Sequence, residues 1–335
     1  SSDLRQFTMT LTRRQTHERE ALMETTAIVF EDPGKLQVKR LGLTEPSDFD
    51  VVVETMVSGV STGTEKMLFD GTMPAFPGMR YPLVPGYESV ARVVGAGPLS
   101  GRTVGETVFI PGASCFEGAA GLFGATANRL VLPGVRTIQI SEDFSEDAVL
   151  LALAATAHHA LIRAESPVDL IIGHGVLGRL MARLACALGQ EPPIVTETCP
   201  DRMHGADDYD VLAPNDARAS KPFDTIIDAS GNQDALDPAI SRLTKGGTLV
   251  LAGFYGERVS FAFPAAFMRE ISVLLSAEFK PDDLQAVVDL VDSGRLSLGG
   301  LVTHHAAPSD AAKAYRTAFD DPACLKMVID WRKAA

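Results

Sequence analysis

Short apolar runs, separated by glycine and proline, fill the chain from Thr26 to about Leu150. Their β-branched residues, or their alternation of apolar and polar positions, are typical of strands that bury one face. Turn residues interrupt the pattern every few positions. We expect strands at Ala27–Phe30, Leu36–Leu41, Val51–Ser58, Ser89–Val94, Thr107–Ile110 and Arg129–Leu132. This part of the chain is therefore predicted to form a compact, mostly antiparallel β domain.

The pattern changes at Ser145, beyond which helical segments alternate with short β-branched strands. Such alternation predicts an α/β fold, a doubly wound parallel sheet with helices on both faces. We expect helices at Glu146–Arg163, Leu177–Leu188, Ala235–Leu243 and Asp282–Ser293. We expect strands at Asp169–Ile172, Ile194–Glu197, Tyr209–Leu212, Thr225–Ala229, Thr248–Ala252 and Ile271–Ala277. The short segment between the second and third of these strands has room for a single helical turn.

The two ends of the chain differ from both patterns. Residues 1–22 are polar and charged without a clear apolar period, so we expect a disordered extension or the remnant of a tag. The tail from Leu301 holds a helix and a final strand, which we expect to rejoin the β domain. The predicted domains are therefore residues 23–148 with 300–335, and residues 149–299.

The composition restricts the number of domains, the partners and the cellular compartment that we expect. A chain of 335 residues that is 46% hydrophobic and 22% charged is typical of a globular protein of two domains. The net charge of −13 and the lack of a basic cluster argue against nucleic acid or an anionic membrane as a partner. Four scattered cysteines without a CxxC pair indicate a reducing cytoplasm. The longest apolar stretch, Ala148–Ile162, is too short to span a bilayer.

A glycine motif organises the second domain. The apolar run Val168–Ile172 leads into Gly-His-Gly-Val-Leu-Gly, and a helical period follows. Gly173 allows the tight turn from strand to helix, Gly175 lets the backbone approach a pyrophosphate, and Gly178 lets helix and strand pack closely. The helix that follows supplies unpaired backbone N–H groups and the positive end of its dipole. Val176 and Leu177 lie at its start, and we predict that they also bind the cofactor. The alternative is a glycine turn without a ligand.

Glu197 ends the next predicted strand, nineteen residues after Gly178. A carboxylate there accepts hydrogen bonds from the ribose hydroxyls of NAD and repels the 2′-phosphate of NADP. The alternative is an ordinary surface glutamate, and nearby Arg202 is the feature that favours NADP. Ligands of such sheets lie at the carboxyl ends of the strands. The further cofactor-binding residues that we predict there are Ser230, Gly231, Gly253 and Phe254.

The order of a β domain, a nucleotide-binding domain and a return to the first resembles the medium-chain dehydrogenase/reductase superfamily. Val57–Leu68 is similar to the first active-site loop of that superfamily, and Pro82–Val94 to its Gly-His-Glu strand. Leu150–Leu161 is similar to the helix that enters the cofactor domain, which implies that Thr156 contacts the nicotinamide. The resemblance implies a GroES-like β catalytic domain joined to a Rossmann domain.

This chain differs from the superfamily at the positions that bind the catalytic zinc. The zinc ligands of the superfamily, two cysteines and a histidine, correspond here to Ser61 (or Thr62), Tyr87 and Ala152. Hydroxyls and a methyl group do not form a tetrahedral zinc site. The structural zinc lobe is also missing, because only Cys115 lies in that region. We therefore predict an enzyme without a metal.

Without zinc, a side chain must accept or relay the proton of an alcohol substrate. We predict a hydroxyl cluster of Ser61, Thr64 and Tyr87, with Glu88 supplying or relaying charge. The alternative is that the two small hydroxyls cap a turn and that Glu88 is a buried structural carboxylate. His158 is a further candidate base, although histidines on an alanine-rich helix more often serve packing.

The runs 57–97, 108–134 and 171–180 resemble one branch of the superfamily, which oxidises the 3-(1-hydroxyethyl) group of bacteriochlorophyllide a to 3-acetyl. This implies a tetrapyrrole substrate, a magnesium bacteriochlorin or chlorin. The thioethers and flat rings of the segment Met67–Tyr81, expected to be a loop, suit such an apolar ligand, although this loop can instead fold onto its own small core. Arg80 is expected to pair with a substrate propionate. The predicted substrate residues are Met67, Phe69, Met73, Phe76, Arg80, Phe116 and Phe123.

Two other functions stay open at this point. A zinc-free quinone or enone reductase of the same superfamily normally uses NADPH, and Glu197 argues against it. A catalytically silent NAD-binding regulator would bind nucleotide without turning over any hydroxyethyl pigment. In each case, Val259–Phe263 and the strand at Ile271 are a candidate edge for a homodimer.

Overall fold

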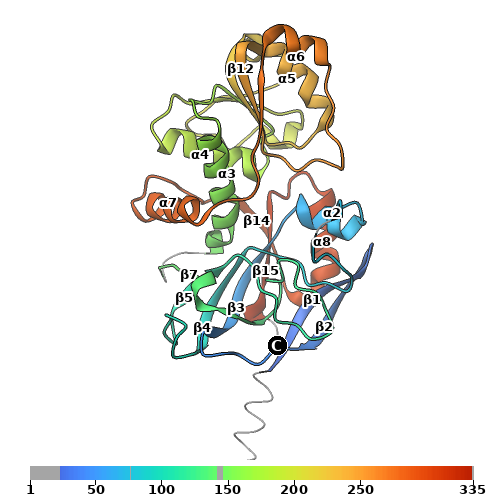
Figure 1. Cartoon of the computed structure of the whole chain (residues 1–335), viewed down its shortest axis with the longest axis vertical. Coiled ribbons are helices and arrows are strands. Elements are labelled where there is room, and N and C mark those ends of the chain that lie inside the picture. Colours follow the sequence, from blue (N-terminus) through green and yellow to red (C-terminus); the bar gives the residue numbers. More distant parts are fainter. Residues whose placement is uncertain (1–22, 76, 142–145, 334–335) are drawn as a thin grey trace, which may run out of the picture.

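The computed structural model describes residues 23–75, 77–141 and 146–333. Figure 1 shows two lobes, one above the other, with helix α3 (Leu151–Arg163) running from the lower lobe into the upper one. The predicted extension at residues 1–22 and the predicted substrate residue Phe76 lie outside the described residues.

The lower lobe is built from mostly antiparallel strands, as the alternating pattern predicts, and only β14 and β15 pair in parallel among its described strands. Its main sheet has the order β14-β15-β3-β4-β5-β7, with β6 also paired to β3, and β1 and β2 form a separate hairpin. The strands of the first part of the chain are β1 (Glu24–Asp32), β2 (Lys35–Gly42), β3 (Asp50–Val60), β4 (Ser89–Ala96), β5 (Thr107–Ile110), β6 (Arg129–Pro133) and β7 (Ile138–Gln139). The two-residue β7 is too short to leave a pattern in the sequence.

The C-terminal segment completes this sheet, which confirms that the tail rejoins the β domain. It consists of β14 (Val302–Ala306), α8 (Ala311–Asp320) and β15 (Lys326–Asp330). Strand β15 pairs antiparallel with β3. Just beyond it, the buried Trp331 donates its indole N–H to Ser58 Oγ at 2.9 Å. We propose the predicted boundaries, residues 23–148 with 300–335 and residues 149–299, as the division into domains.

The upper lobe contains a parallel sheet of the order β10-β9-β8-β11-β12-β13. The strand order reverses between β8 and β11, which is where ligands bind in sheets of this type. Its strands are β8 (Leu170–Ile172), β9 (Ile194–Thr196), β10 (Val211–Leu212), β11 (Phe223–Asp228), β12 (Leu243–Leu251) and β13 (Ser272–Leu275). The predicted short connection after β9 is a single 3₁₀ turn, Pro200–Arg202.

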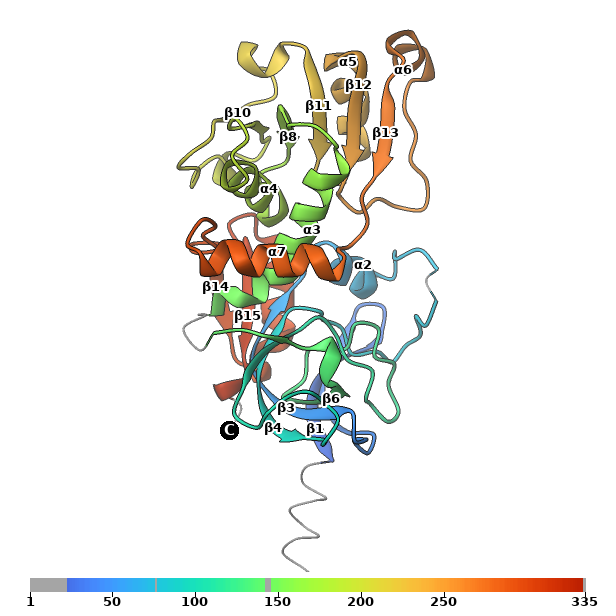
Figure 2. The same cartoon turned by 60° about the vertical axis from the view of Figure 1, so that its left-hand side comes forward.

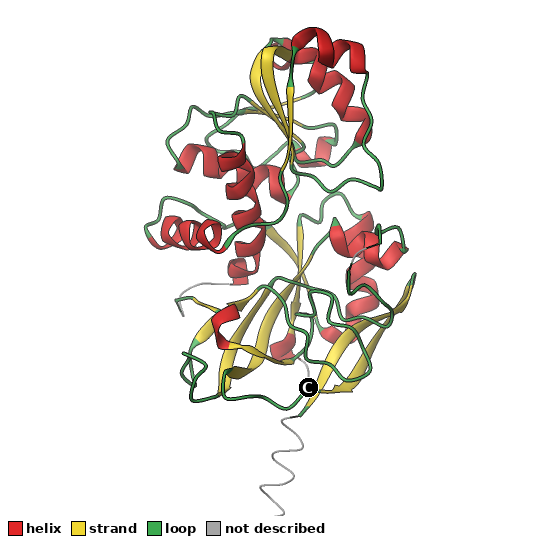
Figure 3. Ribbon diagram, in the orientation of Figure 1, coloured by secondary structure: helices red, strands yellow, loops and turns green. Residues whose placement is uncertain are grey.

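Helices cover both faces of this sheet (Figure 3). Helices α3, α4 (Val176–Ala187) and α7 (Pro281–Asp292) share one hydrophobic core with Ile171 and Ile227. Helices α5 (Leu236–Arg242) and α6 (Phe263–Arg269) share the opposite core with Leu170 and Ile226. Neighbouring residues of one strand therefore enter different cores, which explains why these strands are apolar at every position.

Two short helices were not predicted. Helix α2 (Thr64–Asp70) buries only Glu65 and Leu68, so a charged residue occupies one of its two core positions. Helix α6 buries only Ala266 and leaves its aromatic residues exposed. Neither helix therefore shows the apolar period by which helices are recognised. Figure 2 shows α7 lying across the junction of the two lobes. Among the described residues, no helix combines the length and apolarity that crossing a membrane requires.

Replacing Trp331 tests whether the returning tail is part of the first lobe's core. We expect Trp331→Ala to lower the free energy of unfolding by about 3–5 kcal/mol, because it leaves a large cavity. Trp331→Phe keeps most of the packing and should cost about 1–3 kcal/mol, since Ser58 then loses a buried partner. Urea denaturation followed by far-ultraviolet circular dichroism measures both. An alanine variant as stable as the parent would contradict this account.

Candidate active site

A cavity of about 1640 Å³ is lined by residues of both lobes. Most of the predicted cofactor-binding residues line it, and they come from the carboxyl ends of the parallel strands and from helices α3 and α4. Those in the lining are Thr156, Gly173, Gly175, Val176, Leu177, Glu197, Ser230, Gly253 and Phe254. The structure does not place Gly178 or Gly231 in the lining, because both are packed behind it.

The glycine loop has the backbone geometry that its motif predicts. Gly173 has a φ of +98°, a left-handed conformation that favours glycine. A Cβ on Gly178 would lie 1.9 Å from the carbonyl oxygen of Gly173, so only glycine allows this approach of helix to strand. A Cβ on Gly175 would meet only Arg202 Nη1, at 3.9 Å. The space in front of Gly175 is therefore open to a ligand.

The same loop begins helix α4. Its N-cap residue is Gly175, and no side chain caps the first turn. The first N–H groups of a helix have no partner within it and carry the positive end of the helix dipole. This end of the cavity fits the pyrophosphate of a dinucleotide.

Glu197 is almost completely buried at the end of β9. Its Oε1 accepts the N–H groups of Thr198 and Cys199, and its Oε2 accepts that of His174 at 2.8 Å. Burial alone would raise the pKa of Glu197, but these hydrogen bonds outweigh it and hold the pKa below its usual value. The group is therefore a carboxylate whose Oε2 retains one acceptor site for a ribose hydroxyl.

The ring of His174 has a structural role that the glycine motif alone does not predict. Its buried ring bonds the carbonyl oxygen of Arg202 through Nδ1 and the hydroxyl of Tyr209 through Nε2. Burial lowers the pKa of His174 to about 4, so the ring is neutral at pH 7. A carbonyl only accepts, so Nδ1 carries the proton and Nε2 accepts from Tyr209. The ring thus fastens the segment after β9 to the glycine loop.

Asp228, at the end of β11, is a positioning residue that sequence reasoning missed. It accepts hydrogen bonds from Ser230 Oγ at 2.6 Å, from the N–H of Gly231 at 2.9 Å and from the hydroxyl of Tyr255. Burial raises the pKa of this carboxyl group. An acidic residue directly before Ala-Ser-Gly at a strand end was the available signal. The carboxyl group of Asp228 fixes the turn that carries Ser230 into the cavity lining.

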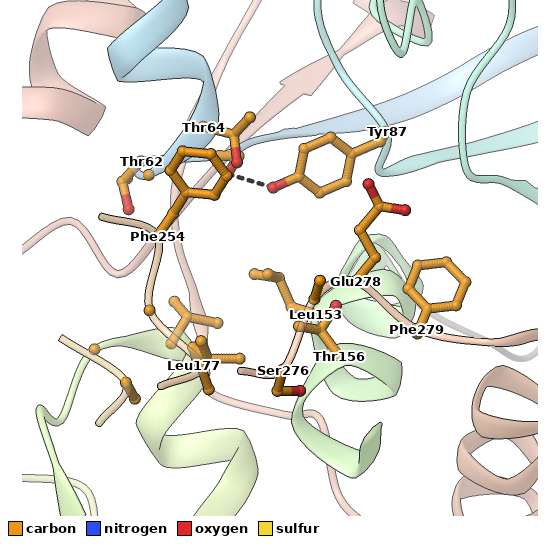
Figure 4. Close-up of a pocket in the computed structure, with 18 of the residues that line it drawn as sticks. Thr62, Thr64, Tyr87, Leu153, Thr156, Leu177, Phe254, Ser276, Glu278 and Phe279 are labelled. Atoms are coloured by element: carbon orange, nitrogen blue, oxygen red, sulfur yellow. Dashed lines mark hydrogen bonds between the residues drawn. The ribbon is translucent and has the colours of Figure 1, made fainter. Parts of the chain in front are cut away.

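The predicted hydroxyl cluster is assembled in the cavity wall contributed by the first lobe. Ser61 Oγ lies 2.6 Å from Tyr87 Oη, and Thr64 lies on the same side of this phenol in the cavity lining. Figure 4 shows Thr64 and Tyr87 pointing toward one another. Burial, then the charge of Glu88, raises the pKa of Tyr87 well above its usual value. The phenol is therefore neutral and acts as a hydrogen-bonding group.

Glu88 lies behind this cluster and is absent from the cavity lining. It is fully buried, and its Oε2 accepts from Lys326 Nζ at 2.6 Å. Lys326, which the sequence analysis missed, also donates to the carbonyl oxygen of Val60. Burial raises the pKa of Glu88, while Lys326 opposes this rise. A lysine within the buried strand β15 was the only sequence signal for the pair.

Glu65 holds the turn that presents Ser61. Its Oε1 accepts the N–H of Ser61 at 3.0 Å, and its Oε2 accepts the hydroxyl of Tyr315 at 2.9 Å. Burial raises the pKa of Glu65 to about 8. This side chain therefore serves the backbone of the corner and is itself out of reach of the cavity.

His158 is not brought to the cavity. Its Nδ1 bonds Asp283 Oδ1 at 2.8 Å, and the neighbouring His159 bonds the other oxygen of the same carboxylate at 2.9 Å. Asp283 lies in the first turn of α7, so both rings join α3 to α7. The position of His158 therefore agrees with a packing role, the alternative to a catalytic base.

The corner where the superfamily holds zinc does not fit that ion. Ser61 and Tyr87 present hydroxyls, and Ala152 presents a methyl group. No group of three or more His, Cys, Asp or Glu in the described part of the chain is arranged to hold a metal. The chemistry of this site therefore has to be derived from hydroxyl groups.

Only part of the predicted substrate set reaches the cavity, where Met73 and Phe123 are found. Met67 and Phe69 belong to α2 and pack on the core beside Phe30, because the expected loop starts as a helix. Phe116 packs against the core of the β domain.

Of the two remaining substrate candidates, Arg80 lies outside the cavity lining and Phe123 lies within it. Arg80 is exposed and absent from the lining, which corrects its expected position. Phe123 has a φ of +67°, and its ring packs edge-on against Tyr87 at 5.2 Å between centroids. Sequence reasoning missed three lining residues that Figure 4 labels, which are Leu153, Glu278 and Phe279.

Comparison with known proteins identifies the family. Residues 180–293 match the family model described as zinc-binding dehydrogenase. The chain is 50% identical to 2-desacetyl-2-hydroxyethyl bacteriochlorophyllide A dehydrogenase of Rhodobacter capsulatus, over 93% of this chain and 100% of that protein. It is 48% identical to the protein of the same name from Cereibacter sphaeroides, with the same coverage.

Solved structures confirm the fold. A short chain alcohol dehydrogenase from Escherichia coli CFT073, complexed with NADH, matches with a TM-score of 0.78 and 20% identity over 92% of this chain and all of that one. A protein from Sinorhizobium meliloti 1021 bound to NADP matches with a TM-score of 0.76 and 18% identity, over 92% of this chain and 99% of that one. The α/β fold with a GroES-like and a Rossmann domain is confirmed. The chain therefore belongs to the medium-chain dehydrogenase/reductase superfamily, in the same family as the two bacteriochlorophyllide dehydrogenases.

Proposed function

We propose that this protein oxidises the hydroxyethyl group of bacteriochlorophyllide a, or of the related chlorin, to an acetyl group with NAD. The supporting observation is one cavity that joins a dinucleotide-binding glycine loop to a corner of hydroxyl groups. Relatives that carry the name of this activity are 50% and 48% identical to the chain. A secondary alcohol and NAD⁺ would yield a ketone, NADH and a proton.

The side chains of the cavity have separate tasks in this reaction. Bound NAD supplies the hydride acceptor. Thr156 of α3 and Leu177 of α4, which both line the cavity, would orient the nicotinamide. The substrate hydroxyl would bond Tyr87 Oη, and its proton would pass through Tyr87 to Ser61 Oγ at 2.6 Å and on to solvent. The neutral phenol suits a relay because it gives one proton as it takes another.

The charge of Glu197 supports NAD over NADP. Its carboxylate lies in the cavity lining and would face the adenosine ribose, where a 2′-phosphate brings like charge. Arg202 lies beside Gly175, on the pyrophosphate side of the loop, and its Nε donates to the carbonyl oxygen of Pro322. This arginine is therefore placed to neutralise the pyrophosphate, which both dinucleotides share.

We also propose a homodimer in the reducing cytoplasm. Strand β13 is an edge strand, and its outer edge has no pairing partner among the described strands. Leu275 at the end of β13 is an exposed apolar side chain, and so are Phe267 and Met268 in the preceding helix α6. An uncovered edge with apolar neighbours is a typical site of association. All four cysteines are free, as a reducing compartment requires.

The direct test of the activity is incubation of the purified protein with hydroxyethyl bacteriochlorophyllide and NAD. We expect the pigment spectrum to change to that of the acetyl product as NADH appears in equal amount. Parallel reactions hold quinone or enone substrates with NADPH. Reduction of those substrates without pigment oxidation would establish the reductase, and nucleotide binding without any turnover would establish a silent regulator.

Glu197 variants test the choice of dinucleotide. We expect the parent to prefer NAD over NADP in kcat/KM, and Glu197→Gln to lose about 10- to 100-fold of that preference, since it loses a charge-assisted hydrogen bond and the repulsion. Thermal unfolding without nucleotide controls for the backbone contacts of this side chain. A parent that prefers NADP, or a variant with unchanged preference, would show that Glu197 does not select the cofactor.

The hydroxyl relay is tested by Tyr87→Phe and Ser61→Ala. Each should lower kcat/KM for the pigment by about 100-fold or more, because a positioned proton-transfer group is lost. NAD affinity should stay unchanged. The double variant should lose little more than either single variant, because members of a relay act as one unit. Thr62→Ala is the matched neighbour, for which we expect a smaller loss. Full turnover by Tyr87→Phe would remove that residue from the mechanism.

A further inference from the structure

Two arginines in the cavity lining have no carboxylate partner. Arg102 and Arg136 both line the cavity, and neither forms an ion pair with any acidic residue in the part of the chain that the structure describes. The chain holds 43 acidic residues against 30 lysines and arginines, so carboxylates are abundant. Guanidinium groups that stay unpaired beside a cavity in an acidic protein indicate a site for an anion.

The other cations of the lining are already engaged. Lys326 is held by Glu88 behind the hydroxyl corner. Arg202 lies beside Gly175, at the pyrophosphate end of the cavity, and donates to the carbonyl oxygen of Pro322. Neither of these groups belongs to the segments that carry Arg102 and Arg136. Arg102 and Arg136 therefore remain available to bind a ligand other than the dinucleotide.

Arg102 is held in a fixed orientation by the residue that follows Arg136. Its Nε donates to Thr137 Oγ1 at 2.8 Å, and its Nη2 donates to the carbonyl oxygen of Thr137 at 2.5 Å. Thr137 is itself buried and bonds the carbonyl oxygen of Gly134. The remaining guanidinium nitrogen, Nη1, makes no hydrogen bond among the described residues. A guanidinium fixed in this way loses little freedom when it binds an anion.

Both arginines lie at the edge of the lower sheet. Arg102 precedes β5 and Arg136 precedes β7, and these two strands pair with one another (Figure 1). Beside them, Pro111, Val135 and Ile138 line the cavity with apolar groups. This wall therefore has an apolar surface with two cations, and it lies in the same cavity as the hydroxyl corner. A flat apolar molecule with a carboxylate on its rim is complementary to it.

We propose that Arg102 and Arg136 bind the free propionate carboxylate of the tetrapyrrole while its hydroxyethyl group lies at Tyr87. The proposal rests on the proposed function and adds a specificity element to it. The two groups project from different rings of the macrocycle, so two anchors fix how the pigment lies in the cavity. An ester of the propionate keeps the ring and loses the charge. The site therefore selects the free acid over the ester.

Esterification of the pigment is the direct test. We compare the free acid with its methyl ester as substrates of the parent and of Arg136→Ala, which removes an exposed side chain that forms no ion pair among the described residues. The parent should favour the acid by about 10- to 100-fold in kcat/KM, mainly through KM, because charge-assisted hydrogen bonds are lost with the ester. Arg136→Ala should lose most of this preference, and the double variant with Arg102→Ala nearly all of it. The kcat/KM for the methyl ester should stay within about threefold of the parent value in each variant.

Two further arginine variants make the comparison specific. Arg40→Ala removes an exposed charge on β2 that pairs with Glu24 and controls for the change in net charge. Arg80→Ala tests the residue that the sequence favoured. Both should retain the full preference for the acid. Loss of that preference in Arg80→Ala, or equal kcat/KM for acid and ester in the parent, would overturn the proposal.

A binding measurement separates this proposal from the proposed function. Pigment absorbance titrations without NAD give affinities for acid and ester in the absence of turnover. A preference for the acid that depends on Arg136 supports the carboxylate site even where no oxidation occurs. Oxidation of both pigments with no preference at either stage refutes the site and leaves the function standing. Thermal unfolding of each variant confirms that it is folded.

Discussion

A buried ion pair holds the hydroxyl corner together. Lys326 Nζ lies 2.6 Å from Glu88 Oε2, and both side chains are almost completely shielded from water. Removing one partner of such a pair leaves an uncompensated buried charge, which costs far more than an exposed ion pair contributes. Through Lys326, the pair also bonds the carbonyl oxygen of Val60, directly before Ser61. Strand β15, the residue after Tyr87 and the turn of Ser61 are therefore fixed in one arrangement.

The second half of the site depends on backbone geometry. Gly173 and Gly178 bring the first turn of α4 against β8, and the carboxylate of Glu197 accepts the N–H of His174 within the loop. The neutral ring of His174 then ties the segment after β9 to the same loop. These contacts fix the uncapped N-terminus of α4, the end at which we propose that the pyrophosphate binds. The cavity places it opposite a corner whose hydroxyl groups replace the thiolates and imidazole of a zinc site.

Much of this arrangement could be predicted from sequence, because local patterns encode it. The strands, the glycine loop and Glu197 were recognised from apolar runs, glycine spacing and the position of one acidic residue. Helix α2 was not, because Glu65 fills a core position and hides the apolar period. The partners of buried polar groups were missed for a different reason. Lys326 and Glu88 are 238 residues apart, and no local pattern connects them.

The substrate end of the cavity was the least predictable part. Arg80 stands in the most suggestive stretch of sequence, yet it is exposed and outside the lining, while Arg136 in an unremarked turn lies within it. Which side chains face a cavity depends on how distant segments fold against one another, and that information is tertiary.

The central claim is that hydroxyl groups perform the proton chemistry at a corner unable to hold zinc. It is tested most directly by measuring pigment oxidation with NAD after exhaustive chelation, with the zinc content of the same sample determined by mass spectrometry. The account predicts undiminished turnover by protein that carries far less than one zinc ion per chain. Zinc bound one to one, with activity that disappears on its removal and returns on its addition, would contradict it.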